Sequence, residues 1–173
     1  MNMNAMSPVL RAYIQTSSNS DEACTWRGRY IEEFAMAEVA ISETLATLST
    51  LASSGAKSLL PTAVGQRFEA LRAVVGTGGP LVAVGGRVAR ALDDLHDHRR
   101  CRNFLCHGST DVSTDDLGNW RMTLSLTSFR AGKVGRSAMQ ITAGEAAVLL
   151  KDLRSARLRL EGQLKGLLAS FTK

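Results

Sequence analysis

The sequence predicts a mainly α-helical protein, an antiparallel bundle of four helices with a small β-hairpin inserted before the last helix. In four segments, apolar residues recur at intervals of three and four, which is typical of helices with one buried face. Before the last of these segments, apolar residues alternate with polar ones, which is typical of a strand; the apolar residues are Trp120, Met122, Leu124 and Leu126. At 173 residues the chain supports one hydrophobic core. We therefore expect a flexible leader over residues 1–20 and a single domain over residues 21–173.

The first helix is expected to begin near Asp21, after a run of serine, threonine and asparagine. Its apolar stripe consists of Ile31, Phe34, Glu38, Ile41, Leu45 and Leu48, in which Glu38 is the exception. A buried carboxylate lowers stability unless it has a cationic partner. Two interpretations stay open: Glu38 lies at the edge of the stripe with its carboxylate in water, or it pairs with Arg102 or His107 and orients them.

The second helix is expected to follow Pro61, a residue well suited to a helix start. Its apolar face is formed by Phe68, Leu71, Val74 and Val75. The next segment, Gly76–Pro80, is glycine-rich, but it lacks the Gly-Lys-Ser/Thr ending of a phosphate-binding loop and a preceding strand. We interpret it as a connection between two helices.

The third helix is predicted from about Leu81 to His107. Its inward stripe is Val84, Val88, Ala91, Leu92 and Leu95, roughly continued by Arg102 and Leu105. Gly85 and Gly86 each lower helix propensity by about 1 kcal/mol relative to alanine. Such residues indicate either a close approach of two backbones or a kink, and the sequence leaves both open.

After Gly108 the chain is polar and turn-rich as far as Asn119. A hairpin is then predicted over residues 120–141, with a turn near residues 131–135. An isolated hairpin is only marginally stable, so it must pack on the bundle or on a partner. Thr142 and Glu145 match a capping box that opens the last helix. The apolar residues of this helix are Val148, Leu149, Leu153, Leu160, Leu164, Leu167 and Leu168.

Charge and cysteine content restrict the class of protein only loosely. The net charge of +5 and the pI near 9.5 are compatible with a polyanionic partner without requiring one. Three cysteines make an odd count, which favours a reducing compartment. The N-terminal segment lacks the features of a signal peptide, and no stretch has the length and apolarity of a membrane span. We expect a soluble cytoplasmic protein with no membrane association.

The most informative segment is Arg102-Asn103-Phe104-Leu105-Cys106-His107-Gly108, at the end of the third helix. Arginine can grip a phosphate through a planar fork of donors, and histidine can exchange a proton near neutral pH. Asn103 and His107 are four residues apart and share a helix face. Arg102 and His107 are five apart and point about 140° from one another, so one helix does not close both onto the same atom. Gly108 suits the left-handed residue that follows many helices, which places His107 in the last turn, where free carbonyls favour positive charge.

This segment, with the surrounding order of helices and hairpin, resembles the HEPN superfamily of all-helical domains. The resemblance implies a metal-independent endoribonuclease without a cofactor, of the kind found as toxins or in phage defence. It also implies a homodimer in which two Arg/His motifs complete one active site, and products with a 2′,3′-cyclic phosphate and a 5′-hydroxyl. An antitoxin or a regulatory protein is then a possible further partner.

The residues themselves are suited to cleavage of RNA. His107 can act as acid or base, and Arg102 can stabilise negative charge on the phosphate. Asn103 can donate a hydrogen bond to phosphate or hold the imidazole. Arg99 and Arg100 are candidate contacts to the RNA backbone. The competing interpretation is that Arg102, Asn103 and His107 only cap and solvate the end of the helix.

Other functions stay open. His96, His98, Cys101, Cys106 and His107 cluster in sequence, but their spacing is not that of common zinc sites, and we expect no metal. Cys101 and Cys106 are interpreted as core or interface residues. A different class of function is a non-catalytic dimerisation or ligand-binding module in a regulatory complex. A nucleotide-binding module that holds ATP or a similar molecule near the same arginine is a weaker alternative.

Overall fold

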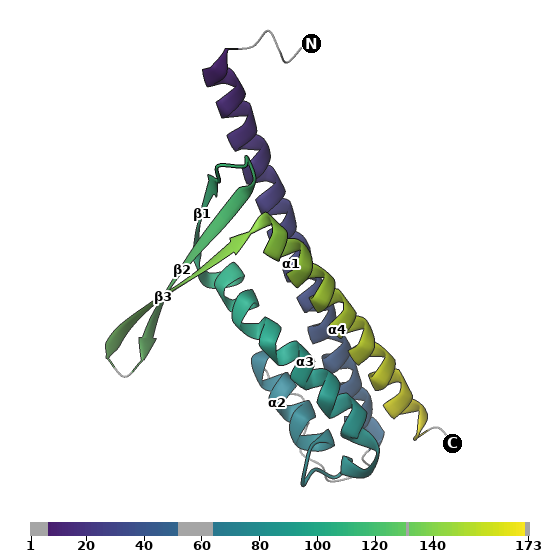
Figure 1. Ribbon diagram of the computed structural model, residues 1–173. Coiled ribbons are helices and arrows are strands. Elements are labelled where there is room, and N and C mark those ends of the chain that lie inside the picture. The colour runs from purple at the N-terminus through teal and green to yellow at the C-terminus, as the bar shows by residue number, and fades with distance from the viewer. Residues whose placement is uncertain (1–6, 52–63, 131, 172–173) are drawn as a thin grey trace. The chain divides into compact units, whose positions relative to one another are not determined.

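A computed structural model describes residues 7–51, 64–130 and 132–171. In these ranges the protein is mainly helical, with four helices and a three-stranded antiparallel sheet that precedes the last helix (Figure 1). The helices are α1 (Pro8–Leu51), α2 (Val64–Val75), α3 (Val82–His107) and α4 (Ala143–Ala169). The strands are β1 (Ser109–Thr114), β2 (Trp120–Arg130) and β3 (Lys133–Thr142), in the order β1-β2-β3. The mainly helical class predicted from sequence is confirmed.

The chain divides into two compact units, each built from separate segments of sequence. The sheet unit comprises Met1–Ile31 and Arg100–Lys151, and the helical unit comprises Glu32–Arg99 and Asp152–Lys173. Helices α1, α3 and α4 each contribute residues to both units. None of the helices in the described ranges has the length and hydrophobicity that a membrane-spanning segment requires.

Helix α1 begins at Pro8 and not near Asp21, so most of the predicted leader is helical. The reason is a tertiary contact that local propensity does not reveal. Asn19 is buried, and its Nδ2 donates hydrogen bonds to Thr114 Oγ1 at 2.9 Å and to the Gly118 carbonyl at 3.0 Å. These bonds offset the low helix propensity of the serine- and asparagine-rich run. Residues 1–6 of the predicted leader lie outside the described ranges.

The sheet unit has a core in which α1 packs against the sheet. Trp120, Met122 and Leu124 of β2 are buried as predicted, whereas Leu126 is half-buried. The Trp26 and Trp120 rings lie 5.9 Å apart. Trp26 Nε1 donates to the Ala146 carbonyl at 2.7 Å, so the indole also holds the start of α4. This packing confirms the alternation of buried and exposed residues predicted from Trp120 onward.

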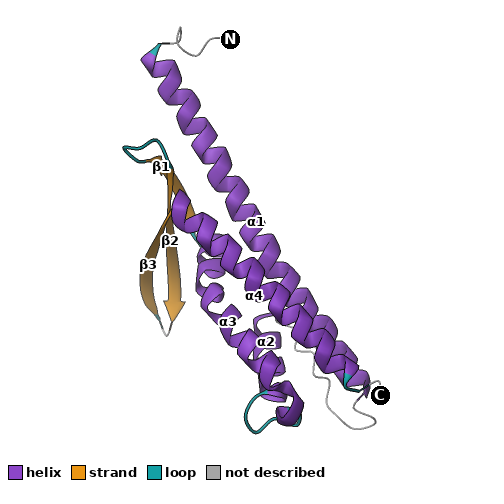
Figure 2. Ribbon diagram, turned by 45° about the vertical axis from the view of Figure 1, so that its right-hand side comes forward, coloured by secondary structure: helices purple, strands orange, loops and turns teal. Residues whose placement is uncertain are grey.

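Strand β1 was not predicted, because its six residues show no apolar alternation. They pair with β2 from Ser109↔Ser125 to Thr114↔Trp120, so main-chain hydrogen bonds form the strand. The result is a twisted three-stranded sheet and not a single hairpin (Figure 2). The β1–β2 turn is stabilised by Asp115, whose Oδ1 accepts hydrogen bonds from the backbone of Leu117 and Asn119.

The helical unit has its own core of apolar residues from all four helices. The predicted faces of α1 and α2 are buried at Phe34, Ile41, Leu45, Leu48, Phe68, Leu71, Val74 and Val75. The Phe34 and Phe68 rings stack with centroids 5.8 Å apart. Val84 of α3 was predicted to face inward but is 51% exposed. Each residue turns the helix by about 100°, and Gly85 takes the inward position instead.

Helix α4 begins with the predicted capping box. Thr142 N–H and its hydroxyl both donate to Glu145 Oε2 at 2.8 Å, and Glu145 N–H donates to Thr142 Oγ1 at 3.3 Å. The backbone hydrogen bond from Thr142 is the main reason that the pKa of Glu145 lies below its ordinary value. Farther along, Leu153, Leu160, Leu164 and Leu167 are buried as predicted, whereas Val148 is 58% exposed because Ala146 takes the inward position.

The glycine-rich segment 76–80 connects α2 to α3, as predicted. Backbone hydrogen bonds fold this connection tightly: Gly76 N–H donates to the Arg72 carbonyl, Gly79 N–H to that of Gly76, and Leu81 N–H to that of Val74. Gly78 adopts a φ of 81°, which favours glycine.

The two adjacent glycines of α3 have different surroundings. A Cβ at Gly85 would lie 2.6 Å from Val75 Cβ and 2.9 Å from Val75 Cα, whereas a Cβ at Gly86 would meet nothing within 4 Å. Gly85 therefore permits a close approach of α3 to the end of α2, which was one of the two interpretations left open by the sequence.

We expect Gly85→Ala to lower the free energy of unfolding by about 1–3 kcal/mol through overpacking. The matched variant Gly86→Ala should raise it by up to about 1 kcal/mol, because only helix propensity changes. Urea denaturation of both variants measures the difference. Equal effects of the two substitutions would contradict the close approach at Gly85.

His98 of α3 should make the helical unit less stable in mild acid. Burial lowers the pKa of His98 below its ordinary value, against the opposing effect of Asp152 and Asp97. The unfolded chain then binds a proton more readily than the folded protein, so the free energy of unfolding falls as the pH drops through the ordinary histidine range.

Urea denaturation at about pH 7.5 and about pH 5.5 brackets this range. We expect His98→Gln to reduce the loss of stability between the two conditions. His96→Gln, at the exposed neighbouring histidine, should leave the loss unchanged. A His98→Gln variant with the same pH dependence as the wild type would show that His98 is not responsible.

Candidate functional site

The residues predicted to act in catalysis lie on the last two turns of α3, within the sheet unit. Asn103 and His107 are exposed, and Arg102 is half-buried. Arg100, Asn103 and His107 follow one another at intervals of three and four, so they occupy one exposed face of the helix. Arg102 points about 140° away from His107. Arg100 thus shares the exposed face of Asn103 and His107, whereas Arg102 lies on another side of the helix.

Arg100 is held in position by its own helix. Its guanidinium carbon lies 5.9 Å from the centre of the Phe104 ring, one turn later, and Phe104 is buried. Arg100 itself is exposed. A guanidinium resting on a fixed ring loses less freedom when it binds an anion than a fully mobile one does.

Arg99, the other predicted RNA contact, belongs to the helical unit and is engaged there. Its Nη1 lies 2.6 Å from Glu69 Oε1, and its guanidinium lies over the Phe68 ring at 5.5 Å. An arginine paired with a carboxylate is less available to a phosphate, so these contacts favour a structural role for Arg99.

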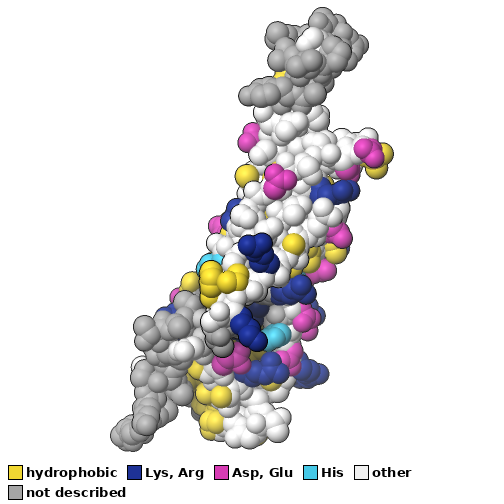
Figure 3. Space-filling view, turned by 90° about the vertical axis from the view of Figure 1, so that its left-hand side faces the viewer, with side chains coloured by type: hydrophobic (Ala, Val, Ile, Leu, Met, Phe, Trp, Pro, Cys, Tyr) yellow, Lys and Arg dark blue, Asp and Glu magenta, His cyan; other side chains and the backbone are white. Residues whose placement is uncertain are grey.

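Basic and acidic side chains are interspersed on the face of the molecule shown in Figure 3.

The end of α3 is anchored by Arg27 of α1. Both Nε, at 2.8 Å, and Nη2 donate to the Leu105 carbonyl, and Nη1 donates to Thr110 Oγ1 at 3.0 Å. One guanidinium thus satisfies a carbonyl of the last turn and holds the first residues of β1. Arg27 fixes the segment that carries His107. The sequence contains no signal for this role, because Arg27 and Leu105 are 78 residues apart.

Gly108 was predicted to adopt the left-handed conformation, and the structure contradicts this. The described glycines with positive φ are Gly78, Gly118 and Gly132. At Gly108 the reason for glycine is space: a Cβ would lie 2.6 Å from the Phe104 carbonyl oxygen and 3.2 Å from that of Ser125. A larger residue would push α3 away from β2.

Glu38 is half-buried in α1 and belongs to the helical unit. Its backbone carbonyl accepts a hydrogen bond from Ser42 Oγ at 2.7 Å. Arg102 and His107 belong to the sheet unit, so the pairing of Glu38 with either of them stays a prediction.

The cysteines near the motif are not alike. Cys101 is buried beside Tyr30, and burial raises the pKa of its thiol, which disfavours the reactive thiolate. Cys101 is thus a core residue, as predicted, while Cys106 is half-buried. Among the described residues, His, Cys, Asp and Glu side chains do not gather in groups of three or more that could hold a metal ion.

Comparison with known proteins gives no relative: no family model, no curated protein and no solved structure matches the chain. The HEPN resemblance therefore stays a prediction that depends on the motif and on the order of helices.

Proposed function

We propose that the protein is a metal-independent endoribonuclease whose active site is formed by the last two turns of α3. The observation that carries this proposal is the exposed face shared by Arg100, Asn103 and His107. It combines a permanent cation, an amide donor and a proton-exchanging imidazole, all accessible to a large anionic substrate.

The reaction follows from these groups. The imidazole of His107 takes the proton of a ribose 2′-hydroxyl, whose oxygen attacks the adjacent phosphorus. The bond from phosphorus to the 5′-oxygen breaks, and that oxygen takes a proton from a second, protonated imidazole. The products are a 2′,3′-cyclic phosphate and a 5′-hydroxyl. Arg100 and Asn103 hold the phosphate, and Arg102 stabilises its developing charge.

A second copy of the chain completes this site. The mechanism uses two imidazoles, a base and an acid, whereas each α3 ends in one histidine. Arg102 and His107 point about 140° apart on one helix, which also favours a second copy. Arg102 of one copy can then reach the phosphate held beside His107 of the other. A twofold arrangement of two α3 ends supplies both groups. As a toxin or a phage-defence component, such an enzyme would require an antitoxin or a regulatory protein to restrain it.

Incubation of the purified protein with end-labelled mixed RNA in excess EDTA tests the proposal. Cleavage that leaves cyclic phosphate ends, and that Arg102→Ala abolishes in a folded protein, is the expected result. Intact RNA with the folded wild-type protein, across RNAs of several classes, would overturn it.

A second candidate is a non-catalytic dimerisation module. An apolar groove of about 610 Å³ runs along α1 and α4 in the helical unit. It exposes Met36 at 45% and Val39 at 55%, which favours burial of this face against a second copy of the chain. A wild-type dimer that Val39→Lys dissociates, together with uncut RNA, would favour this module over the enzyme.

A further inference from the structure

Strands β2 and β3 extend past β1 as a two-stranded hairpin (Figure 1). Strand β1 begins at Ser109, which pairs with Ser125 of β2. After Ser125 the sheet therefore consists of β2 and β3 alone. We call residues 126–137 the outer hairpin. Its cross-strand pairs run from Leu126↔Ser137 to Arg130↔Lys133. Most of its described side chains are exposed, so the outer hairpin contributes little to the core of the sheet unit.

The charged side chains of residues 117–144, a segment that includes the outer hairpin, are all basic. Between Asp116 and Glu145 the sequence holds four basic residues and no acidic one. The basic residues are Arg121, Arg130, Lys133 and Arg136. This segment thus carries four of the five net positive charges of the chain, whereas charges elsewhere are mixed. A local field of this kind attracts a polyanion.

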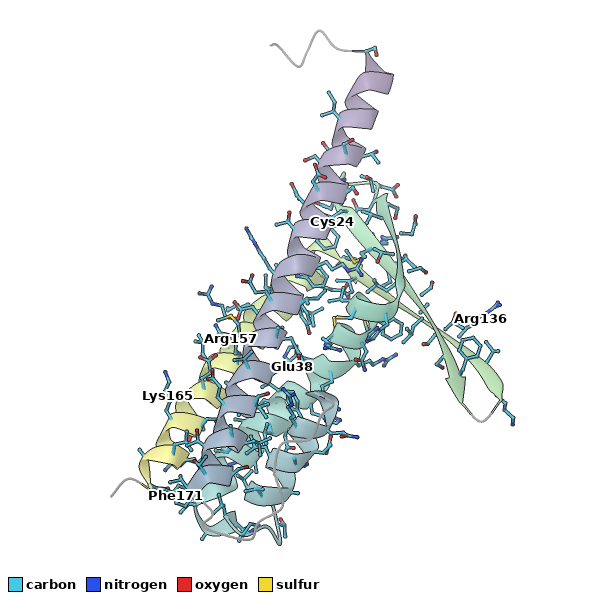
Figure 4. The ribbon with its side chains drawn as sticks, turned by 180° about the vertical axis from the view of Figure 1, so that it is seen from behind. Cys24, Glu38, Arg136, Arg157, Lys165 and Phe171 are labelled. Atoms are coloured by element: carbon cyan, nitrogen blue, oxygen red, sulfur yellow. The ribbon has the colours of Figure 1, made fainter. Side chains whose placement is uncertain are left out.

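One face of the outer hairpin combines an aromatic ring with a cation. Phe129 is 76% exposed and lies opposite Val134, which is 58% exposed. The next pair on the same face is Thr127↔Arg136, because side chains two residues apart along a strand share a face. Figure 4 shows Arg136 on this part of the hairpin. An exposed phenylalanine beside an arginine offers a stacking surface next to a phosphate contact.

We propose that the outer hairpin binds single-stranded RNA, with a base stacked on Phe129 and one backbone phosphate held by Arg136 on the same face. Lys133 pairs with Arg130 on the other face, at the end of the hairpin, and holds a neighbouring phosphate where the RNA passes that end. The choice of RNA rests on the proposed ribonuclease function, for which the hairpin is a substrate-binding surface separate from the catalytic residues. Single strands fit better than a duplex, because their bases are free to stack on a ring. This recognition is independent of base sequence.

The same features have a competing explanation. Basic residues at unpaired strand edges prevent edge-to-edge association of sheets. In that case neutralisation of the charges would cause self-association and leave RNA affinity unchanged, so the two explanations predict different results.

The experiment measures equilibrium binding of a labelled single-stranded RNA of mixed sequence to the full chain carrying His107→Ala, which removes cleavage from the measurement. Into this background we introduce Phe129→Ala, or Lys133→Gln with Arg136→Gln. A matched control, Arg87→Gln with Lys165→Gln, removes the same net charge from exposed positions on α3 and α4. Circular dichroism confirms folding of each variant.

Phe129→Ala should weaken binding of single-stranded RNA about tenfold, and should affect duplex RNA little. The variant without Lys133 and Arg136 should bind more weakly, and its plot of log affinity against log salt should be less steep. The slope should fall by about 1.4, at about 0.7 for each phosphate contact. The control pair should leave this slope unchanged. Binding equal to the control in both hairpin variants, or no binding by the His107→Ala parent at low salt, would overturn the proposal.

The outcomes also separate this inference from the proposed function. Binding that depends on the hairpin, without cleavage by the wild type, would overturn the ribonuclease and leave the RNA-binding hairpin in place. Cleavage by the wild type, with RNA binding that does not depend on the hairpin, would support the ribonuclease and overturn the RNA-binding hairpin. Self-association of the Lys133→Gln, Arg136→Gln variant with unchanged RNA affinity would assign the charges to protection of the strand edge.

Discussion

Replacement of His107 by alanine should lower the rate of RNA cleavage by about 100- to 10,000-fold, the usual contribution of a general acid or base. The side chain is exposed at the end of α3, so its removal leaves no cavity and should leave the free energy of unfolding almost unchanged. Cleavage of end-labelled RNA in EDTA, under single-turnover conditions, measures the effect.

The matched control is His96→Ala, at another exposed histidine of α3 that lies about three turns earlier. It should cleave at the wild-type rate. Equal rates for wild type and His107→Ala would remove the catalytic role of His107. Equal losses in both histidine variants would indicate a general effect on the helix.

A mixture of wild type and an inactive variant tests whether the site is shared between copies. If one site uses the His107 imidazoles of both copies, a mixed dimer of wild type with His107→Ala lacks one of them and is inactive. Random exchange of subunits with an equal amount of His107→Ala should then roughly halve the activity of the wild type, because half of its chains enter mixed dimers. Wild-type activity unchanged by the added variant would show that His107 acts within one copy.

Replacement of Arg157 by alanine should have the largest effect on stability, a loss of about 3 kcal/mol. Its side chain is only 7% exposed, and it pairs with two carboxylates of the helical unit. Arg157 Nε lies 2.6 Å from Glu33 Oε2, and Nη1 lies 2.6 Å from Glu161 Oε1 (Arg157 is labelled in Figure 4). Without the guanidinium, Glu33 and Glu161 are left as two partly buried negative charges without their shared partner.

Two comparisons identify the cause. Arg157→Met keeps most of the apolar contact of the side chain, so a similar loss would assign the effect to charge and not to packing. Arg159→Ala removes an exposed arginine, 58% exposed and 3.5 Å from Asp94, and should cost less than about 1 kcal/mol. Urea denaturation of the three variants measures these losses. An Arg157→Ala variant as stable as Arg159→Ala would contradict the structural role of the buried pair.

Much of the helical structure could be predicted because periodicity is a local property. Phe34, Ile41 and Leu45 recur with the helical period, and a helix with such a stripe gains stability from burial on one face whatever covers it. The capping box at Thr142 and Glu145 is equally local, since its hydrogen bonds span three residues. In the candidate site, the positions of Asn103 and His107 on one face follow from helix geometry alone.

Other features depend on contacts between distant segments, and only the tertiary structure determined them. Strand β1 exists because β2 offers it main-chain partners. Helix α1 extends before Asp21 because Asn19 finds partners in Thr114 of β1 and Gly118 of the β1–β2 turn. Gly85 is required by the proximity of Val75.

The sequence by itself thus determined the helical class, the buried stripes and the chemistry available at the end of α3. The tertiary structure determined that Arg27 anchors this end, that Arg99 is held by Glu69, and that the face of Arg100 and His107 is exposed. The physical reason is the separation along the chain over which each interaction acts. Propensity, periodicity and capping act over a few residues, whereas hydrogen bonds and packing between remote segments depend on how the chain folds.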